Sequence, residues 1–175
     1  MKISTGAQKL YVVEGDRVLI ASPCSVGMAG HETPRGSFRA YNKIAHKRSG
    51  SYGFSIEGSH IRGCKASQAR GRYVGYPMPY WIEFSPAYGI HCGYIKPYPC
   101  THGCVRLPKR VAPKVFALVP TGTPILVATS HAEDATVGKS LPRFDDTTLP
   151  DPPATRIVSQ SIFEDHAYPG KMFVD

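Results

Sequence analysis

Long hydrophobic runs are missing from this sequence, and so is a recognisable export leader. The longest apolar stretches, around 115–119 and 125–128, are far shorter than the ~18 residues that a transmembrane helix needs. Residues 2–9 are polar, and the apolar runs that follow are too short for the hydrophobic region of a signal peptide. We therefore expect a soluble chain with no stable membrane insertion. An exported protein that had lost its leader would look the same.

Extended runs of one charge are also missing. The 175 residues include 21 Lys and Arg against 13 Asp and Glu, which gives a formal net charge of +8. No run of Lys and Arg is longer than two residues, and no zinc-finger or aromatic RNA-binding signature lies between them. We interpret the charge as a solvated basic surface that favours anionic surroundings such as acidic cell-wall material, and we expect no nucleic-acid partner.

The composition is that of an ordinary globular protein with many turns. Hydrophobic residues make up 42% of the chain, and there are 17 glycines and 16 prolines. A domain of about 150 residues removes roughly 70% of its unfolded surface from water on folding, so a core needs no metal or disulfide here. Because the chain becomes acidic and proline-rich after residue 130, we expect one domain over 1–129 and an extension over 130–175 that packs on it or trails from it.

Short β-branched runs predict a mainly β fold. Strands are expected at 10–13 and 18–21, joined by a Gly-Asp turn, and at 37–41, 78–84, 89–93 and 123–129. Alternation within 78–84 places Tyr80, Ile82 and Phe84 on one face and Trp81 and Glu83 on the other. The one convincing helix is 112–119, with Pro113 in its first turn. In the extension, only 156–163 has a pattern that fits an added strand.

Between residues 42 and 77 the pattern dissolves into glycines spaced among Ser, Arg and Lys. A connection of this length in a compact domain is usually a functional lid or a disordered segment. We interpret it as a Gly-rich flap over a cleft. An irregular surface excursion with short strands is the alternative.

Reactive side chains are concentrated in one stretch, 88–107, which holds three of the five cysteines and two of the seven histidines. A nucleophilic cysteine needs a base, a field that stabilises the thiolate and donors that receive an oxyanion. Cys104 has two candidate bases in His91 and His102. His102 lies two residues before the thiol, and residues i and i+2 of an extended segment point the same way.

The backbone around Cys104 supplies the other parts of such a site. Gly103 removes a side chain, so a substrate carbonyl can approach the N–H groups of Gly103 and Cys104, which are our candidates for the oxyanion hole. Arg106 would raise the local positive potential and can bind a substrate carboxylate through two hydrogen bonds.

Three other interpretations of the cluster compete. Zinc sites favour paired C-x-x-C spacing, whereas Cys100 and Cys104 lie four apart, so we expect no metal and no other cofactor. Disulfides between Cys92 and Cys100 and between Cys24 and Cys64 are possible, and free buried thiols are at least as plausible. Either histidine could be a satisfied core residue, and for the other five histidines that role or plain exposure is the expectation.

The cluster resembles the signature of the YkuD-type L,D-transpeptidases, in which an upstream His precedes a Ser/Thr-His-Gly-Cys element. Here His91 is followed by Thr-His-Gly-Cys-Val-Arg-Leu at 101–107. The resemblance extends over roughly residues 8–129. Within it, 33–38 is similar to the family's Thr-Pro-x-Gly-x-Phe turn, 78–80 to the segment before its first His, and 119–127 to its closing helix-to-strand element.

The resemblance implies a sandwich-like catalytic domain that cross-links or modifies peptidoglycan. Such enzymes attack the bond between the L-centre of a diamino acid and the terminal D-Ala of a tetrapeptide stem, form a thioester and release D-Ala. An amine of a second stem then takes the acyl group and gives a 3-3 cross-link. Cys104 is then the nucleophile, His91 the general base and His102 a supporting residue. The expected site comprises the catalytic Cys104, His91, His102 and Gly103 and the substrate-binding Arg106, Tyr80, Met78 and Thr101.

The same resemblance implies partners and a location. Peptidoglycan stem peptides are the expected substrates, carbapenem-type β-lactams the expected covalent inhibitors, and the periplasm or cell envelope the expected compartment. Two features depart from the family pattern. The gap from His91 to His102 is shorter than in many members, and Cys92 stands where a small or hydroxyl residue is more usual, although its backbone carbonyl could still orient His91.

Two alternatives remain open at this point. An L,D-carboxypeptidase or peptidoglycan hydrolase would use the same thioester with water as acceptor. A non-catalytic cell-wall-binding module is the alternative of another class, and the intact set of His91, His102 and Cys104 argues against it.

Overall fold

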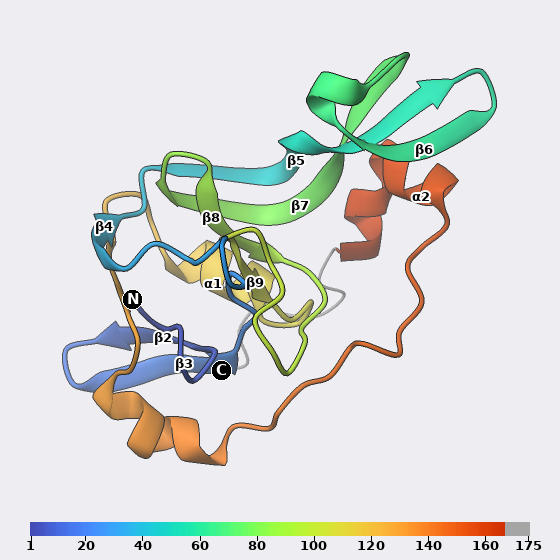
Figure 1. The fold of residues 1–175 in the computed structure, drawn as a ribbon. Coiled ribbons are helices and arrows are strands. Elements are labelled where there is room, and N and C mark those ends of the chain that lie inside the picture. The colour runs from blue at the N-terminus through green and yellow to red at the C-terminus, as the bar shows by residue number, and fades with distance from the viewer. Residues whose placement is uncertain (167–175) are drawn as a thin grey trace.

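The computed structural model of the chain describes residues 1–166, which contain two five-stranded sheets (Figure 1). The first sheet contains β1 (Lys2–Ser4), β2 (Lys9–Glu14), β3 (Arg17–Pro23), β4 (Gly36–Arg39) and β10 (Pro124–Ala128), in the order β3-β2-β1-β10-β4. The second contains β5 (Asn42–Glu57), β6 (His60–Lys65), β7 (Arg72–Ser85), β8 (Tyr88–Cys92) and β9 (Val105–Leu107), in the order β6-β5-β7-β8-β9. The prediction of a mainly β fold is confirmed.

Helices are short and lie outside the sheets. They are α1 (Ala112–Leu118), α2 (Ala154–Val158) and the 3₁₀ helices η1 (Ala66–Gln68), η2 (Ala132–Ala135), η3 (Val137–Ser140) and η4 (Gln160–His166). The predicted helix is confirmed as α1, with Pro113 in its first turn, where a missing N–H costs nothing. No helix within residues 1–166 is long and apolar enough to cross a membrane.

One hydrophobic core joins the two sheets. Ile3 and Leu10 of the first sheet and Ile82 and Ile90 of the second are each at most 1% exposed and belong to one cluster, which Val115 of α1 completes. Fully burying a side chain of this size contributes about 1.5–3 kcal/mol. The predicted alternation of β7 is confirmed, because Ile82 and Phe84 enter this cluster while Trp81 and Glu83 lie on the other face, toward a cleft.

The first sheet includes one strand that the sequence did not predict. The predicted hairpin is present as β2 and β3, and Gly15 at its turn has φ +57°. β1 precedes it and pairs with β2 on one side and, in parallel, with β10 on the other. A three-residue strand has too little alternation to be recognised, and its position is fixed by its two neighbours.

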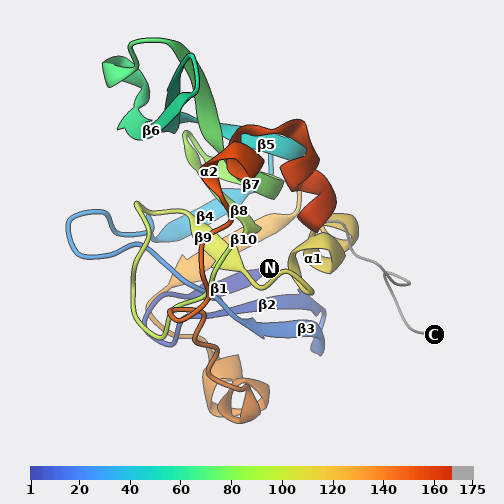
Figure 2. The ribbon, with the colours of Figure 1, turned by 90° about the vertical axis from the view of Figure 1, so that its right-hand side faces the viewer.

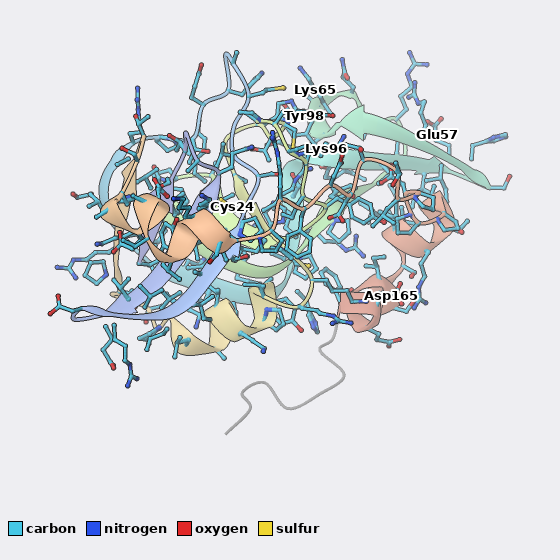
Figure 3. All side chains as sticks on the ribbon, turned by 90° about the horizontal axis from the view of Figure 1, so that it is seen from below. Cys24, Glu57, Lys65, Lys96, Tyr98 and Asp165 are labelled. Atoms are coloured by element: carbon cyan, nitrogen blue, oxygen red, sulfur yellow. The ribbon has the colours of Figure 1, made fainter. Side chains whose placement is uncertain are left out.

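The segment predicted as an irregular flap is in fact two long strands and a hairpin. β5, β6 and β7 extend from the body of the molecule, and Glu57 marks their outer end, far from Cys24 in the core (Figures 1 and 3). Glycines interrupt the sequence pattern of these strands, and they are needed because the backbones of neighbouring strands approach closely. A Cβ at Gly53 would lie 2.3 Å from the Val74 carbonyl oxygen, and one at Gly75 would lie 1.9 Å from that of Ser49.

The predicted strand at 156–163 is wrong, because this segment is helical and forms α2 and the start of η4. It packs against β6 and β7 without joining their ladders, and side-chain contacts from β5 hold it there (Figure 2). The Arg48 guanidinium donates to the carbonyls of Ile157 (3.1 Å) and Ser159 (2.7 Å), and Phe163 stacks on His46 at 4.8 Å.

The part of the extension between β10 and α2, called the tail below, is held on the domain at two places. Asp134 in η2 accepts hydrogen bonds from the hydroxyls of Ser4 and Tyr11, both at 2.7 Å. Further on, Asp146 and Ile95 exchange two hydrogen bonds of 2.8 Å, one from each backbone N–H. This second contact holds the loop that connects β8 to the cysteine motif.

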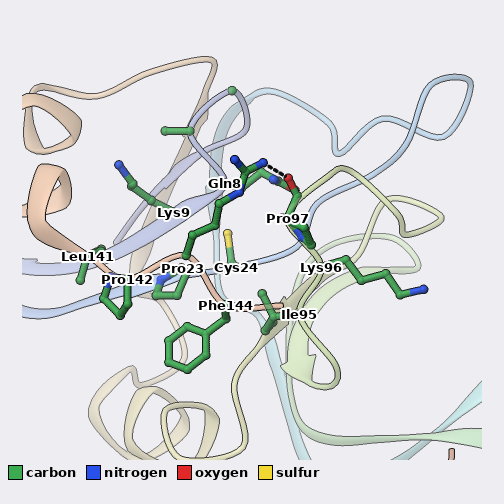
Figure 4. Close-up of a pocket in the computed structure, with 13 residues that line it drawn as sticks. Gln8, Lys9, Pro23, Cys24, Ile95, Lys96, Pro97, Leu141, Pro142 and Phe144 are labelled. Carbon is green, nitrogen blue, oxygen red and sulfur yellow. Dashed lines mark hydrogen bonds between the residues drawn. The ribbon is translucent and has the colours of Figure 1, made fainter. Parts of the chain in front are cut away.

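A small cavity of about 350 Å³ lies between this part of the tail and the first sheet (Figure 4). Cys24 and Phe144 line it, and the side chains of Lys9 and Lys96 extend away from it on opposite sides. All five cysteines are free, so the disulfides considered from the sequence, Cys92 with Cys100 and Cys24 with Cys64, are not formed.

Candidate active site

His91 is a buried imidazole near the end of β8. It is 5% exposed, and its Nδ1 lies 2.7 Å from the backbone carbonyl oxygen of Cys92. A carbonyl only accepts, so Nδ1 carries a proton, and in the neutral form of the ring Nε2 is the nitrogen with the lone pair. The hypothesis that the Cys92 carbonyl orients His91 is thereby confirmed. The ring is poised to take a proton at Nε2.

The parallel pairing of β8 and β9 brings the thiol to the same cleft as the histidine. His91 pairs in register with Arg106, and Cys104 stands immediately before β9. Parallel neighbours require a crossover between them, which is why twelve residues separate two side chains that share one cleft. His91 and Cys104 both line this cleft.

Thr101 and Gly103 set the bend before the nucleophile. Thr101 is 2% exposed; its hydroxyl donates to the Cys104 carbonyl at 2.6 Å and accepts the Gly103 N–H at 3.1 Å. Gly103 has φ +104°, and a Cβ there would lie 2.3 Å from the Tyr88 ring. The expectation that Gly103 helps form an oxyanion hole is therefore not supported, because its N–H is already engaged. The Cys104 N–H is the remaining candidate of the two.

His102 does not take the predicted position in an extended segment, since residues 102–103 form a bend. Its ring stacks on Tyr52 of β5 (centroids 4.7 Å apart, planes at 11°) and meets the edge of His31 at 4.7 Å. Burial, followed by the charges of His31, Arg106 and Lys65, lowers the pKa of His102. His102 is thus a neutral ring that links the cysteine motif to the flap.

The thiol of Cys104 is half-buried and is protonated at neutral pH. Burial raises its pKa, the Gly89 N–H and Arg106 oppose the rise, and Glu83 adds to it. In this structure Sγ lies 3.9 Å from the Ala87 carbonyl oxygen. A thiol of this kind needs a base to become a nucleophile, because the thiolate is the reactive form.

The cleft has a volume of about 950 Å³ and opens between the flap and the end of the second sheet. Of the predicted site residues, it is lined by His91, His102, Cys104, Thr101, Met78 and Arg106. Tyr80 lies elsewhere: its backbone has φ +60°, and its ring packs against Phe116 of α1 at 5.7 Å, in contact with the core. Tyr80 is therefore not among the residues that line the cleft.

Several lining residues were missed by sequence reasoning. His31, which we expected to be exposed or satisfied elsewhere, comes from the loop before β4, and Lys47, Tyr52 and Lys65 come from the flap strands. The only available signal was the interpretation of the glycine-rich segment as a flap over a cleft. That placement is confirmed, although the local structure was predicted wrongly.

Arg106→Gln is expected to shift the alkylation of Cys104 to higher pH. The guanidinium lowers the pKa of the thiol, so its removal raises that pKa and reduces the thiolate fraction at a given pH. The rate of iodoacetamide modification at Cys104, followed by peptide mass spectrometry across pH, measures the midpoint. Arg110→Gln, on an exposed residue outside the cleft, is the control. An unchanged or lower midpoint for Arg106→Gln would contradict the assignment.

A protonated thiol and an oriented imidazole that line one cleft form a cysteine–histidine site, an arrangement typical of enzymes that use nucleophilic catalysis. The family model described as the L,D-transpeptidase catalytic domain, YkuD, matches residues 1–127. The chain therefore belongs to the YkuD family of L,D-transpeptidase catalytic domains. The comparison with curated proteins found none that matches.

Solved structures share this fold at low sequence identity. An L,D-transpeptidase from Mycobacterium smegmatis is 22% identical with a TM-score of 0.56, and the alignment covers 73% of this chain and 57% of that one. An L,D-transpeptidase from Stackebrandtia nassauensis is 22% identical with a TM-score of 0.55, and the alignment covers 75% of this chain and 55% of that one. The catalytic domain of the Enterococcus faecium L,D-transpeptidase is 21% identical with a TM-score of 0.52, and the alignment covers 73% of this chain and 94% of that domain. This chain thus spans little more than half the length of the first two proteins.

Two further similar structures contain bound inhibitors. One is an L,D-transpeptidase in complex with imipenem, and the other is an avibactam carbamoyl enzyme.

Proposed function

We propose that this protein is a peptidoglycan L,D-transpeptidase that uses Cys104 as nucleophile and His91 as general base. The observation that carries the proposal is the pairing of an imidazole fixed through Nδ1 with a protonated thiol in one cleft of a YkuD-family domain. The donor would be a tetrapeptide stem, attacked at the L-centre of the diamino acid that precedes its terminal D-Ala.

The first half-reaction forms a thioester. His91 Nε2 takes the proton from Cys104 Sγ, and the sulfur attacks the carbonyl carbon of the diamino acid. The resulting oxyanion is received by backbone donors, of which the Cys104 N–H is the candidate. The tetrahedral intermediate collapses with cleavage of the C–N bond, and the imidazolium returns its proton to the departing amine of D-Ala.

The second half-reaction transfers the acyl group. The amine of an acceptor stem attacks the thioester carbonyl and gives its proton to His91, and the Cys104 thiolate leaves and is reprotonated. The cleft volume of about 950 Å³ is near the upper end of ordinary ligand pockets, roughly 300–1,000 Å³, which supports a peptide occupant on one or both sides of the thiol. Since the proposed substrate is peptidoglycan, we propose that the protein acts in the periplasm or cell envelope.

Product analysis tests which acceptor is used. The purified protein is incubated with a defined disaccharide-tetrapeptide, and the products are resolved by mass spectrometry. Dimers with a 3-3 cross-link and free D-Ala support transpeptidation. Tripeptides as the only product would mean that water accepts the acyl group and that the protein is an L,D-carboxypeptidase. Binding of the muropeptide without any turnover would overturn both enzymatic proposals.

β-Lactam capture follows from the same chemistry. A carbapenem presents a strained acyl group to the Cys104 thiol, and ring opening by sulfur leaves a stable covalent adduct. The similar structures bound to imipenem and avibactam support this proposal for the present chain.

A further inference from the structure

The small cavity between the tail and the first sheet is built partly from residues outside the family match (Figure 4). The match ends at residue 127, whereas Arg143 and Phe144, which line the cavity, belong to the tail. The volume of about 350 Å³ is at the lower end of the range for ligand pockets, roughly 300–1,000 Å³. The cavity therefore has room for a small molecule or for one ring of a larger one.

Hydrogen bonds fix the tail side of the cavity. The Arg143 guanidinium donates to the Pro97 carbonyl, and the Tyr94 hydroxyl donates to the Pro150 carbonyl at 2.9 Å. Between these contacts, the backbone of Ile95 forms the two hydrogen bonds with the tail described above. The tail is thus held along the loop from Tyr94 to Pro97, and its wall of the cavity is preorganised.

Gln8 lines the cavity on the side of the sheet, and its amide oxygen lacks a partner. Oε1 is buried and accepts no hydrogen bond from any residue within 1–166. The backbone of Gln8 has φ +52°, and its carbonyl accepts the Cys24 N–H at 2.8 Å, so the residue is held in place at a conformational cost. A buried acceptor is disfavoured unless a donor completes it. A hydroxyl or amide N–H of a ligand in the cavity would be such a donor.

The charges around the cavity favour a neutral polar ligand over an anion. Lys9, Lys96 and Arg143 line it, but the side chains of Lys9 and Lys96 extend away from it (Figure 4). Hydrogen bonds from Thr147, and then the charges of Arg143 and Lys96, lower the pKa of Asp145. Two of the three cations therefore have an acid in their surroundings, and an anion in the cavity would gain little.

Apolar groups line much of the remaining wall. Phe144 is 41% exposed, and Pro23, Ile95 and Pro142 are among the lining residues. Apolar and aromatic surface with a few polar groups is typical of a ligand site, and here it suits methyl groups and the C–H faces of a sugar ring. A molecule that combines such groups with hydroxyl and amide N–H donors is an N-acetylated amino sugar.

The cavity lies within reach of a sugar whose peptide stem occupies the cleft. Ser25 and Arg106 exchange two backbone hydrogen bonds, of 2.9 and 3.1 Å, in an antiparallel bridge. Cys24, which lines the cavity, and Cys104 therefore lie about three strand positions apart, or roughly 10 Å. In a muropeptide, a lactyl group and two residues separate the sugar from the third residue of the stem, and an extended chain spans about 3.5 Å per residue. The two distances are similar.

We propose that this cavity binds the N-acetylated amino sugar that carries the donor stem, with the amide of Gln8 as its hydrogen-bonding group and the ring of Phe144 as its apolar contact. This inference rests on the proposed function and adds a sugar subsite to it. Donors attached to glycan are then preferred over free stem peptides.

A matched pair of donors tests this preference. A disaccharide-tetrapeptide and the same tetrapeptide without its sugars are compared by kcat/KM for D-Ala release. We expect the glycan-bearing donor to be favoured by about tenfold, the effect of a hydrogen bond and an apolar contact, and mainly through a lower KM. In Gln8→Leu and in Phe144→Ala the preference should fall toward unity. Leu149→Ala is the matched control and should keep the native preference, because Leu149 is an exposed tail residue that lines neither the cavity nor the cleft.

Binding of the sugar alone tests the position of the subsite. The stem-free disaccharide of N-acetylglucosamine and N-acetylmuramic acid is titrated into the isotope-labelled native protein and followed by NMR. Cellobiose, a disaccharide without acetamido groups, is the control ligand. We expect the backbone amide signals of Gln8, Cys24 and Phe144 to shift with the first sugar and not with cellobiose.

Three results would each overturn the inference while D-Ala release upheld the proposed function. These are equal kcat/KM values for the two donors, the full native preference in both folded variants, and sugar-induced shifts confined to cleft residues such as His91. Release of D-Ala from neither donor would overturn the proposed function and the inference with it. The titration needs no variant and decides the matter if neither variant folds.

Discussion

Replacement of Cys104 with alanine is expected to reduce D-Ala release from tetrapeptide stems by about 10⁴-fold or more. The thiol is the only group in the cleft that the proposed chemistry uses to form an acyl-enzyme, and the His91 and His102 rings take no part as nucleophiles in that chemistry. The methyl group is smaller than the side chain it replaces and leaves the strands on either side intact. The variant should therefore fold normally and fail only in chemistry.

Covalent capture of a carbapenem is a second test of this variant. Intact-protein mass spectrometry after incubation with a carbapenem should show an adduct on the native protein and none on Cys104→Ala. Cys100→Ala is the matched control, since Cys100 is half-buried four residues away and does not line the cleft. If Cys104→Ala kept D-Ala release and carbapenem capture, the nucleophile would have to be sought elsewhere.

His91→Gln is expected to lower kcat/KM by about 10²- to 10⁴-fold at neutral pH, the usual contribution of a general base. The amide of glutamine can replace part of the hydrogen bonding to the Cys92 carbonyl, but it cannot accept the thiol proton. Because burial raises the pKa of Cys104, little thiolate forms without the base at neutral pH. The remaining activity should therefore increase nearly tenfold per pH unit until the thiol ionises by itself.

The pH profile separates this role from a structural one. His60→Gln, on an exposed residue of β6, should keep the native profile. A His91→Gln variant that showed the native pH dependence at reduced rate would indicate that His91 only supports the fold.

Much of the fold was predictable where local pattern and burial agree. Alternation in β7 placed Ile82 and Phe84 on the face that enters the core, and the helix predicted at 112–119 is α1, which packs on the same core. The pattern failed where other forces decide the structure. Gly53 and Gly75 allow close backbone contact, and the helical segment around Ile157 is held by contacts with the side chains of Arg48 and His46, which lie far from it in the sequence.

The site divides in a similar way. His91 and Cys104 were predictable because their chemistry is concentrated in one short stretch, and the Cys92 carbonyl acts within one residue of the base it orients. Tyr52 and His31 were not, because they reach the motif from segments more than 45 residues away in the sequence, through ring contacts that leave no local signal.

Backbone conformation accounts for the two predicted roles that changed. Tyr80 shared a face with Ile82 in the alternation of β7, and its positive φ and packing on α1 keep it at the core. Gly103 was expected to donate to an oxyanion, but the bend that its φ of +104° permits turns its N–H onto the Thr101 hydroxyl. Neither torsion angle can be read from residue types alone.

The proposed mechanism requires a thioester at Cys104. A defined tetrapeptide donor is mixed with the protein in the absence of an acceptor amine, the reaction is quenched in acid, and the trapped adduct is mapped by peptide mass spectrometry. We predict a tripeptidyl adduct, with D-Ala lost, on the peptide that contains Cys104 and on no other. Turnover of the donor with an adduct on a different residue, or with no covalent intermediate under any quench, would contradict the account.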